Sequence, residues 1–345
     1  MIIPASRILW LDALRAFLAL GVAFHHVNPD AEDAVSWVNC LLVTVRVPCF
    51  YFLTGYFLGL SLRSVNGHTA LSQIIRRFRQ LIVPASFFLL LVDFSKIHAL
   101  KVFSFQENFF LNSLFWSSAL VIVIVLLCGM SGVYRWRMYI LMLLAIVASY
   151  LLFRISHLNI PYFDLNCTLH SIIFVVGGYW VGTYRKIPEM LKSPVLIILA
   201  AGIYLTSTIM DMSLYMSEPL YKAYHRIILP YIGIYAIFGG FFMMRQWFRH
   251  DSLQGQIAYY LGQRSLPLYV IVWVVMTLLV DVGSILPQSL PQEMRSVLIF
   301  ICYTSLSLLM HDLMCCIPGF GTIIFGRRNN VISPFMPMCI QRMLQ

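Results

Sequence analysis

Long apolar runs separated by short polar segments are the feature that most constrains how this chain can fold. A run of about 20 apolar residues is long enough to cross the hydrocarbon core of a bilayer as a helix. Ten candidate spans lie near residues 8–27, 35–60, 81–99, 109–130, 136–153, 168–183, 194–212, 227–244, 266–281 and 295–316. The pattern predicts an all-α, polytopic membrane protein with about ten transmembrane helices. The membrane domain is expected over residues 1–316 and a cytoplasmic tail over residues 317–345.

The composition excludes an ordinary soluble protein. Of the 345 residues, 60% are hydrophobic and only 11% are charged, whereas soluble domains carry about 25% charged residues. The net charge of +10 is spread over short basic clusters between the apolar runs. Nucleic-acid binding instead needs a basic stripe interleaved with aromatic residues, so no nucleic-acid partner is expected. The eight cysteines show no paired CxxC spacing, so no metal site is predicted.

The distribution of Lys and Arg predicts the orientation of the spans. Of the 24 Lys and Arg residues, sixteen fall on one side of the predicted membrane and six on the other. Because cytoplasmic loops are enriched in Lys and Arg, both termini are placed in the cytoplasm. An even number of spans agrees with this placement. The first apolar run ends in His25 and His26 instead of a small-residue cleavage site. We therefore expect this run to be a retained transmembrane helix and not a cleaved signal peptide.

Ionisable residues inside the first span need a partner or a function, because each is costly in lipid. Asp12 and Arg15 lie three residues apart and can form an ion pair near the cytoplasmic boundary. His26 follows Arg15 by eleven residues, which on a helix brings it back to the same face within about 20°. The two side chains would be separated by about 16 Å along the axis, so they would serve different parts of one ligand or channel. His25 points about 100° away and is the weaker candidate. A purely structural role for the ion pair and for His26 stays open.

Arg46 lies deep in the second span, two residues before Pro48. An arginine at that depth must face the interior of the bundle and find an acceptor. Pro48 also frees a backbone carbonyl that a neighbouring group can use. Arg46 is therefore a candidate functional residue. The alternative is a buried structural arginine held by carbonyls or by a first-loop carboxylate, namely Asp30, Glu32 or Asp33.

A basic loop is expected before the third span, with the sequence RRFRQLIVP at residues 76–84. A guanidinium binds phosphate in bidentate fashion, so Arg76 and Arg79 are candidates for holding the phosphates of a cytoplasmic cofactor. The alternative is a cluster that only anchors the cytoplasmic end of a helix. Further polar residues near span ends are possible partners of Arg46 or His26, and the sequence does not choose among them. They are Asp93, Asp164, Asp211, Asp281, His311 and Asp312.

Several segments together resemble the acyltransferase 3 family of multi-pass membrane O-acyltransferases. The opening helix WLDALR at 10–15, followed by ten residues and His26, is similar to the family's arginine and histidine pattern. The run RVPCFYFLTGY at 46–56 is similar to its arginine, proline and aromatic segment. Weaker likenesses follow in the basic loop, in FVVGGY at 174–179 and in LGQRSLPLY at 261–269. One departure is that many members carry a histidine after the late serine and tyrosine, where this chain has VIVW at 270–273.

The resemblance implies transfer of an acyl group, usually acetyl, from cytoplasmic acyl-coenzyme A to a hydroxyl of a cell-surface sugar or glycolipid. A sugar hydroxyl is a poor nucleophile at neutral pH, and histidine suits the role of base. His26 is therefore expected to be the base, with a transient acyl-histidine as a variant. Arg15 and Arg46 would stabilise the developing oxyanion or position the donor, and Arg76 and Arg79 would bind the phosphates of coenzyme A. The expected location is the cell inner membrane, as a multi-pass protein.

A second hypothesis is a transporter or flippase of lipid-linked glycans. Such a protein would also have ten or more spans and arginines inside the membrane. It would show no dependence on acyl-coenzyme A, which distinguishes the two hypotheses by experiment. Absence of a large loop between spans argues against a glycan polymerase, and a purely structural scaffold leaves Arg15, Arg46 and His26 unexplained together.

Overall fold

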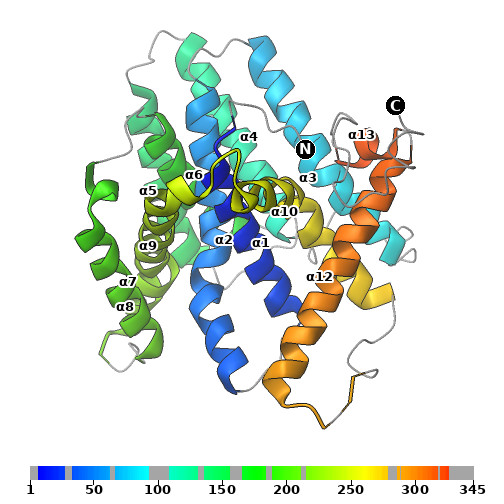
Figure 1. The fold of residues 1–345 in the computed structure, drawn as a ribbon. Helices are drawn as coiled ribbons and strands as arrows, with labels where there is room; N and C mark the ends of the chain where they lie inside the picture. The colour runs from blue at the N-terminus through cyan, green and yellow to red at the C-terminus, as the bar shows by residue number, and fades with distance from the viewer. Residues whose placement is uncertain are drawn as a thin grey trace. The chain divides into compact units, whose positions relative to one another are not determined.

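A computed structural model of the chain describes the helices and the segments that flank them (Figure 1). The described residues are 7–27, 33–62, 67–92, 109–130, 136–155, 165–183, 189–210, 215–278, 286, 287, 289–317 and 319–325. All regular structure within them is helical, which confirms the predicted all-α class. The elements are α1 (Leu9–Val27), α2 (Asp33–Ser61), α3 (Gly67–Val92), α4 (Phe109–Met130), α5 (Arg137–Ile155), α6 (Leu165–Thr183), η6 (Glu189–Lys192), α7 (Pro194–Ile209), α8 (Glu218–Ala223), η8 (Tyr224–Ile228), α9 (Leu229–Met243), η9 (Met244–Trp247), α10 (Leu253–Leu278), α12 (Gln292–Cys316) and α13 (Phe320–Phe325).

Five helical stretches in the described part of the chain are long and apolar enough to cross a membrane. They are Trp37–Ser61, Phe110–Met130, Leu165–Thr183, Glu218–Trp247 and Gln292–Cys316. Large apolar side chains are also exposed along other helices, among them Leu143 and Ile146 on α5 and Ile198 on α7. Exposed apolar surface of this extent fits a protein surrounded by lipid. The count of ten spans and the cytoplasmic termini stay predictions.

The segment before the third predicted span is a helix, and the expectation of a basic loop there is wrong. Helix α3 begins at Gly67, well before the predicted start at residue 81, and includes Arg76 and Arg79. Arg, Gln and Leu all favour helix, and the helix continues through Pro84. Similarly, α10 begins at Leu253 and not near residue 266. Arg264 therefore lies within a helix.

The chain divides into two compact units. One unit comprises Met1–Arg46 and Ser193–Gln345, and the other comprises Val47–Lys192, so the division falls within α2. In the first unit, α1 packs against α9, α10 and α12, and α7 packs along α9. In the second unit, α4 packs against α3 and α6, and α5 packs against α6. Residues 326–345 lie outside the described part, and the predicted boundary at residue 316 stays a prediction.

Two pairs of glycines bring α2 and α6 into backbone contact within the unit Val47–Lys192. Gly55 and Gly59 lie one turn apart on α2, and Gly178 and Gly182 lie one turn apart on α6. A Cβ atom on Gly178 would overlap the carbonyl oxygen of Phe52, and similar overlaps would arise at the other three glycines. Small residues at four-residue spacing let membrane helices approach closely. These glycines therefore hold the two helices at a distance that no larger residue permits.

Buried hydroxyl groups join the same two helices to α4. The hydroxyl groups of Tyr51 and Ser113 lie 2.7 Å apart, and Ser171 Oγ donates to the Ser113 carbonyl oxygen at 3.2 Å. All three residues are almost fully buried. Hydrogen bonds between helices take the place of water for polar groups inside a membrane protein. Glycine packing and these hydrogen bonds thus join α2, α4 and α6 within this unit.

Candidate active site

Helix α1 carries two of the predicted site residues, Arg15 and His26, on one continuous stretch from Leu9 to Val27. Both side chains are partly buried. Because the helix is continuous between them, Arg15 and His26 lie on the same face of α1, as their spacing predicts. His26 lies at the carboxyl end of α1, and Arg15 lies in its first half. The arrangement leaves them far apart along the helix, as the sequence predicts.

Asp12 forms its closest ion pair with a residue that sequence reasoning did not select. Arg7 Nε and Nη2 donate to the two carboxylate oxygens of Asp12 at 2.7 and 2.9 Å. The predicted partner, Arg15, has its Nη1 atom 3.9 Å from Asp12 Oδ1. The predicted pair is thus present but looser, and the bidentate partner is Arg7. The sequence offered no signal for Arg7, because it precedes the helix.

His26 contacts Tyr269 of α10 in the same unit. The two rings lie 6.0 Å apart between centroids and are inclined at 77°. The ring of His25 lies 5.8 Å from that of His26. Close packing of α10 on α1 supports this arrangement, since a Cβ atom on Gly262 would come within 2.5 Å of the Asp12 carbonyl oxygen. Tyr269 belongs to the late segment of the family resemblance, and that was the signal that could have selected it as a site residue.

Arg46 is buried, with 6% of its surface exposed. Its Nη1 atom donates to the carbonyl oxygen of Gly21 on α1 at 3.4 Å. Arg46 also lies within electrostatic range of His26 and Tyr269. The predicted interior position of Arg46 is therefore confirmed, and one carbonyl partner is identified. The alternative partners Asp30 and Glu32, and the side chain of Asp33, lie outside the described residues.

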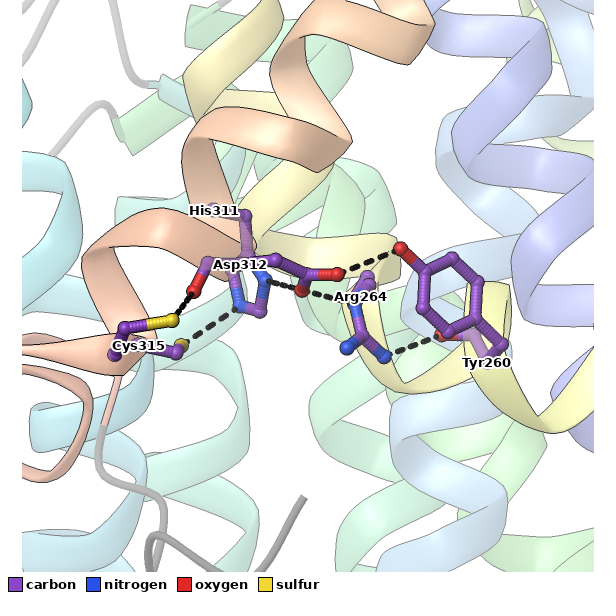
Figure 2. A network of polar contacts seen from close by, with 6 residues as sticks. Tyr260, Arg264, His311, Asp312 and Cys315 are labelled. Atoms are coloured by element: carbon purple, nitrogen blue, oxygen red, sulfur yellow. Dashed lines mark hydrogen bonds and ion pairs between the residues drawn. The ribbon is translucent and has the colours of Figure 1, made fainter. Parts of the chain in front are cut away.

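The remaining candidate partners do not gather around Arg46 in the described part of the chain. Asp312 and His311 instead form a separate buried network with α10 (Figure 2). Asp312 accepts hydrogen bonds from Arg264 Nε at 2.7 Å and from the Tyr260 hydroxyl at 2.8 Å. The Arg264 guanidinium also lies over the Tyr260 ring, 3.8 Å from its centroid. The residues at 93, 164, 211 and 281 lie outside the described part.

Removal of the Asp312 carboxylate is expected to destabilise the protein strongly. Arg264 is only 2% exposed, so Asp312→Ala would leave a buried guanidinium without its carboxylate. Breaking a buried ion pair in this way costs about 3–5 kcal/mol in the free energy of unfolding. Helix content followed during detergent-induced unfolding in micelles measures the loss. The control is the double variant Arg264→Met with Asp312→Leu, which removes both charges. It should recover much of the stability that Asp312→Ala loses. Equal stability of Asp312→Ala and the native protein would contradict the assignment.

Arg76 and Arg79 belong to the unit Val47–Lys192 and lie on α3. Both side chains are exposed. Residues three apart on a helix lie on the same face, so the two guanidinium groups are presented together. Their proposed role in binding phosphate stays a prediction. Among the described residues, no three His, Cys, Asp or Glu side chains are grouped so as to hold a metal ion.

Comparison with protein families identifies the chain. Residues 8–311 match the acyltransferase domain of the acyltransferase 3 family. No curated protein matches, and no solved structure matches. The matched segment includes α1, α2 and α10, which carry His26, Arg46 and Tyr269. It covers most of the chain and assigns an acyltransferase activity to it. The protein belongs to the acyltransferase 3 family.

Proposed function

We propose that the protein transfers an acyl group, most simply acetyl, from cytoplasmic acyl-coenzyme A to a hydroxyl of a cell-surface sugar or glycolipid. The observation that carries the proposal is the ring contact of His26 with Tyr269, with the buried Arg46 held to the helix of His26 through the Gly21 carbonyl oxygen and within electrostatic range of both rings. A base, a cation and a phenol at one place provide the groups that acyl transfer to a hydroxyl requires.

His26 has the role of general base in this proposal. Its imidazole takes the proton of the acceptor hydroxyl as the oxygen attacks the thioester carbonyl. Collapse of the tetrahedral intermediate then expels the thiolate of coenzyme A, which receives the proton back from the imidazole. In the variant with an acyl-histidine, the imidazole attacks the thioester first and the hydroxyl displaces it. The contact with Tyr269 orients the imidazole ring in either case.

Arg46 is suited to the negative charge that develops on the carbonyl oxygen. A guanidinium has five N–H donors, and the contact with Gly21 in the described part of the chain uses one of them. Burial strengthens its interaction with an oxyanion, because a low-dielectric site screens charge poorly. Arg15, which lies nearer the amino end of α1 and close to Asp12, is assigned to positioning the donor.

The two exposed arginines of α3 give a testable prediction about the donor. If Arg76 and Arg79 bind the phosphates of coenzyme A, Arg76→Ala with Arg79→Ala raises KM for acyl-coenzyme A by about tenfold or more and changes kcat little. Steady-state rates at varied donor concentration measure both constants. Lys192, in the same unit, is a control for loss of positive charge, and Lys192→Ala should leave KM unchanged. An unchanged KM in the double variant would contradict phosphate binding and would indicate that the two arginines only anchor the helix at the membrane surface.

The proposed activity is tested by release of coenzyme A and by movement of label. Purified protein in nanodiscs is given radiolabelled acetyl-coenzyme A, with and without a membrane glycolipid extract. We expect label in the glycolipid fraction together with release of free coenzyme A. Failure of any acyl-coenzyme A to bind or turn over would reject the proposal and favour a transporter of lipid-linked glycans.

A further inference from the structure

A second cluster of reactive side chains lies at the carboxyl end of α12, outside the site around His26. It consists of Cys315, His311 and Asp312, which Figure 2 shows in one line with Arg264 and Tyr260. The distance from His311 Nδ1 to Asp312 Oδ1 is 3.0 Å, and that from His311 Nε2 to Cys315 Sγ is 3.6 Å. The imidazole thus connects a carboxylate on one side with a thiol on the other.

The order of these contacts determines which way a proton can move. A carboxylate can only accept hydrogen bonds, so His311 Nδ1 donates to Asp312. In the neutral imidazole the other nitrogen, Nε2, is then an acceptor and faces the thiol of Cys315. A base held in a fixed tautomer by a carboxylate and directed at a nucleophile is the arrangement that activates cysteine and serine nucleophiles.

The surroundings of the cluster keep this tautomer in place. Asp312 is oriented by the hydrogen bonds from Arg264 and Tyr260. His311 is only 2% exposed and packs against the ring of Phe325 at 4.9 Å between centroids. Cys315 is partly exposed. The thiol is therefore the member of the cluster that a reagent can reach.

The neighbouring cysteine makes a different contact in the described part of the chain. Cys316 directs its thiol to the carbonyl oxygen of Asp312, with 3.0 Å between Sγ and the oxygen. A main-chain carbonyl accepts a hydrogen bond but does not remove the proton. Cys316 is also partly exposed. It is therefore a matched control on the same helix end.

We propose that Cys315 accepts an acyl group from acyl-coenzyme A, with His311 as its base and Asp312 as the residue that positions His311. His311 Nε2 takes the proton of the thiol, and the thiolate attacks the carbonyl carbon of the donor thioester. The new bond joins Cys315 Sγ to the acyl carbon. The bond that breaks joins this carbon to the sulfur of coenzyme A, which leaves as a thiolate and is reprotonated by His311. One thioester replaces another, so no further reactant is needed.

This proposal rests on the proposed function in one respect, namely that acyl-coenzyme A is the donor. The predicted topology places the carboxyl end of α12 on the cytoplasmic side, where this donor occurs. Cys315 would then be a second acyl acceptor, either a holding point for the transferred group or a site of self-modification.

The experiment has two readouts on the purified full-length chain in nanodiscs. The first omits any acyl-coenzyme A and maps alkylation by iodoacetamide at neutral pH with mass spectrometry. We expect Cys315 to react about tenfold or more faster than Cys316, with the difference lost in His311→Gln. The second adds acetyl-coenzyme A or palmitoyl-coenzyme A and searches for an acyl group that neutral hydroxylamine releases. We expect it on Cys315, absent in Cys315→Ala and retained in Cys316→Ala.

Each outcome decides the proposal separately from the function of the His26 site. Equal alkylation of the two cysteines overturns it, because the imidazole then does not activate the thiol. Fast alkylation without a thioester from either donor also overturns the role as acyl acceptor, even if glycolipid is acetylated. A thioester on Cys315 without any labelled glycolipid supports this proposal and contradicts the proposed function. Since the mapping uses the native chain, it does not depend on whether His311→Gln folds.

Discussion

Acyl transfer is expected to be lost in the variant His26→Ala, while the folded protein stays in the membrane. General base catalysis by a positioned side chain contributes about 10²–10⁴-fold to a rate. Alanine removes the imidazole and its contact with the Tyr269 ring. The partial burial of His26 at the carboxyl end of α1 implies a modest effect on stability. Transfer of radiolabelled acetyl from acetyl-coenzyme A to glycolipid, with membrane content measured in parallel, checks the prediction.

The neighbouring histidine offers the matched control. His25 lies one residue earlier on α1, so its side chain points about 100° around the helix from that of His26. We expect His25→Ala to keep most of the transfer activity, because the contact with Tyr269 belongs to His26. Full activity in His26→Ala would show that His26 is not the base. Loss of activity in both variants would indicate that the end of α1 matters through its structure.

The second large effect is expected at the contact between α2 and α6. Gly178→Val is expected to prevent the unit Val47–Lys192 from folding, because a Cβ atom at this position would overlap the carbonyl oxygen of Phe52. Backbone cannot yield as a flexible side chain can, so the helices would have to separate. Because Tyr51 of α2 and Ser171 of α6 both bond to Ser113 of α4, separation would also strain this link between the two helices. Size-exclusion chromatography in detergent and protease resistance measure the loss of folded protein.

A glycine in an open position is the control for the substitution itself. Gly202 lies on α7, and a Cβ atom there would meet nothing within 4 Å. Gly202→Val should therefore leave the yield of folded protein nearly unchanged, since valine is tolerated in membrane helices. A well-folded Gly178→Val protein would show that α2 and α6 do not touch through their backbones. Equal loss in both variants would point to a general effect of valine in these helices.

Much of the fold was predictable from the sequence, and the reason is local. In lipid every backbone polar group must be satisfied within the element, so long apolar runs must become helices. Helical phase likewise depends only on spacing along the chain, which placed Arg15 and His26 on α1 and predicted their common face. The burial of Arg46 followed from the cost of placing an arginine in lipid. Boundaries were less predictable, because polar helix formers such as Arg76 and Arg79 extend α3 beyond its apolar part.

The sequence by itself therefore determined the all-helical class and the membership of the acyltransferase 3 family, and it selected His26 and Arg46 as candidate site residues. Only the tertiary structure decided the partners. Arg7 pairs with Asp12, and the ring of Tyr269 lies beside that of His26. Asp312 is hydrogen-bonded to Arg264 and to His311. Apart from the contact between the neighbours His311 and Asp312 on α12, these contacts join separate helices, or a helix to the segment before it, and depend on which faces pack together. Spacing along the chain carries no information about that choice when several carboxylates are equally suited to one cation.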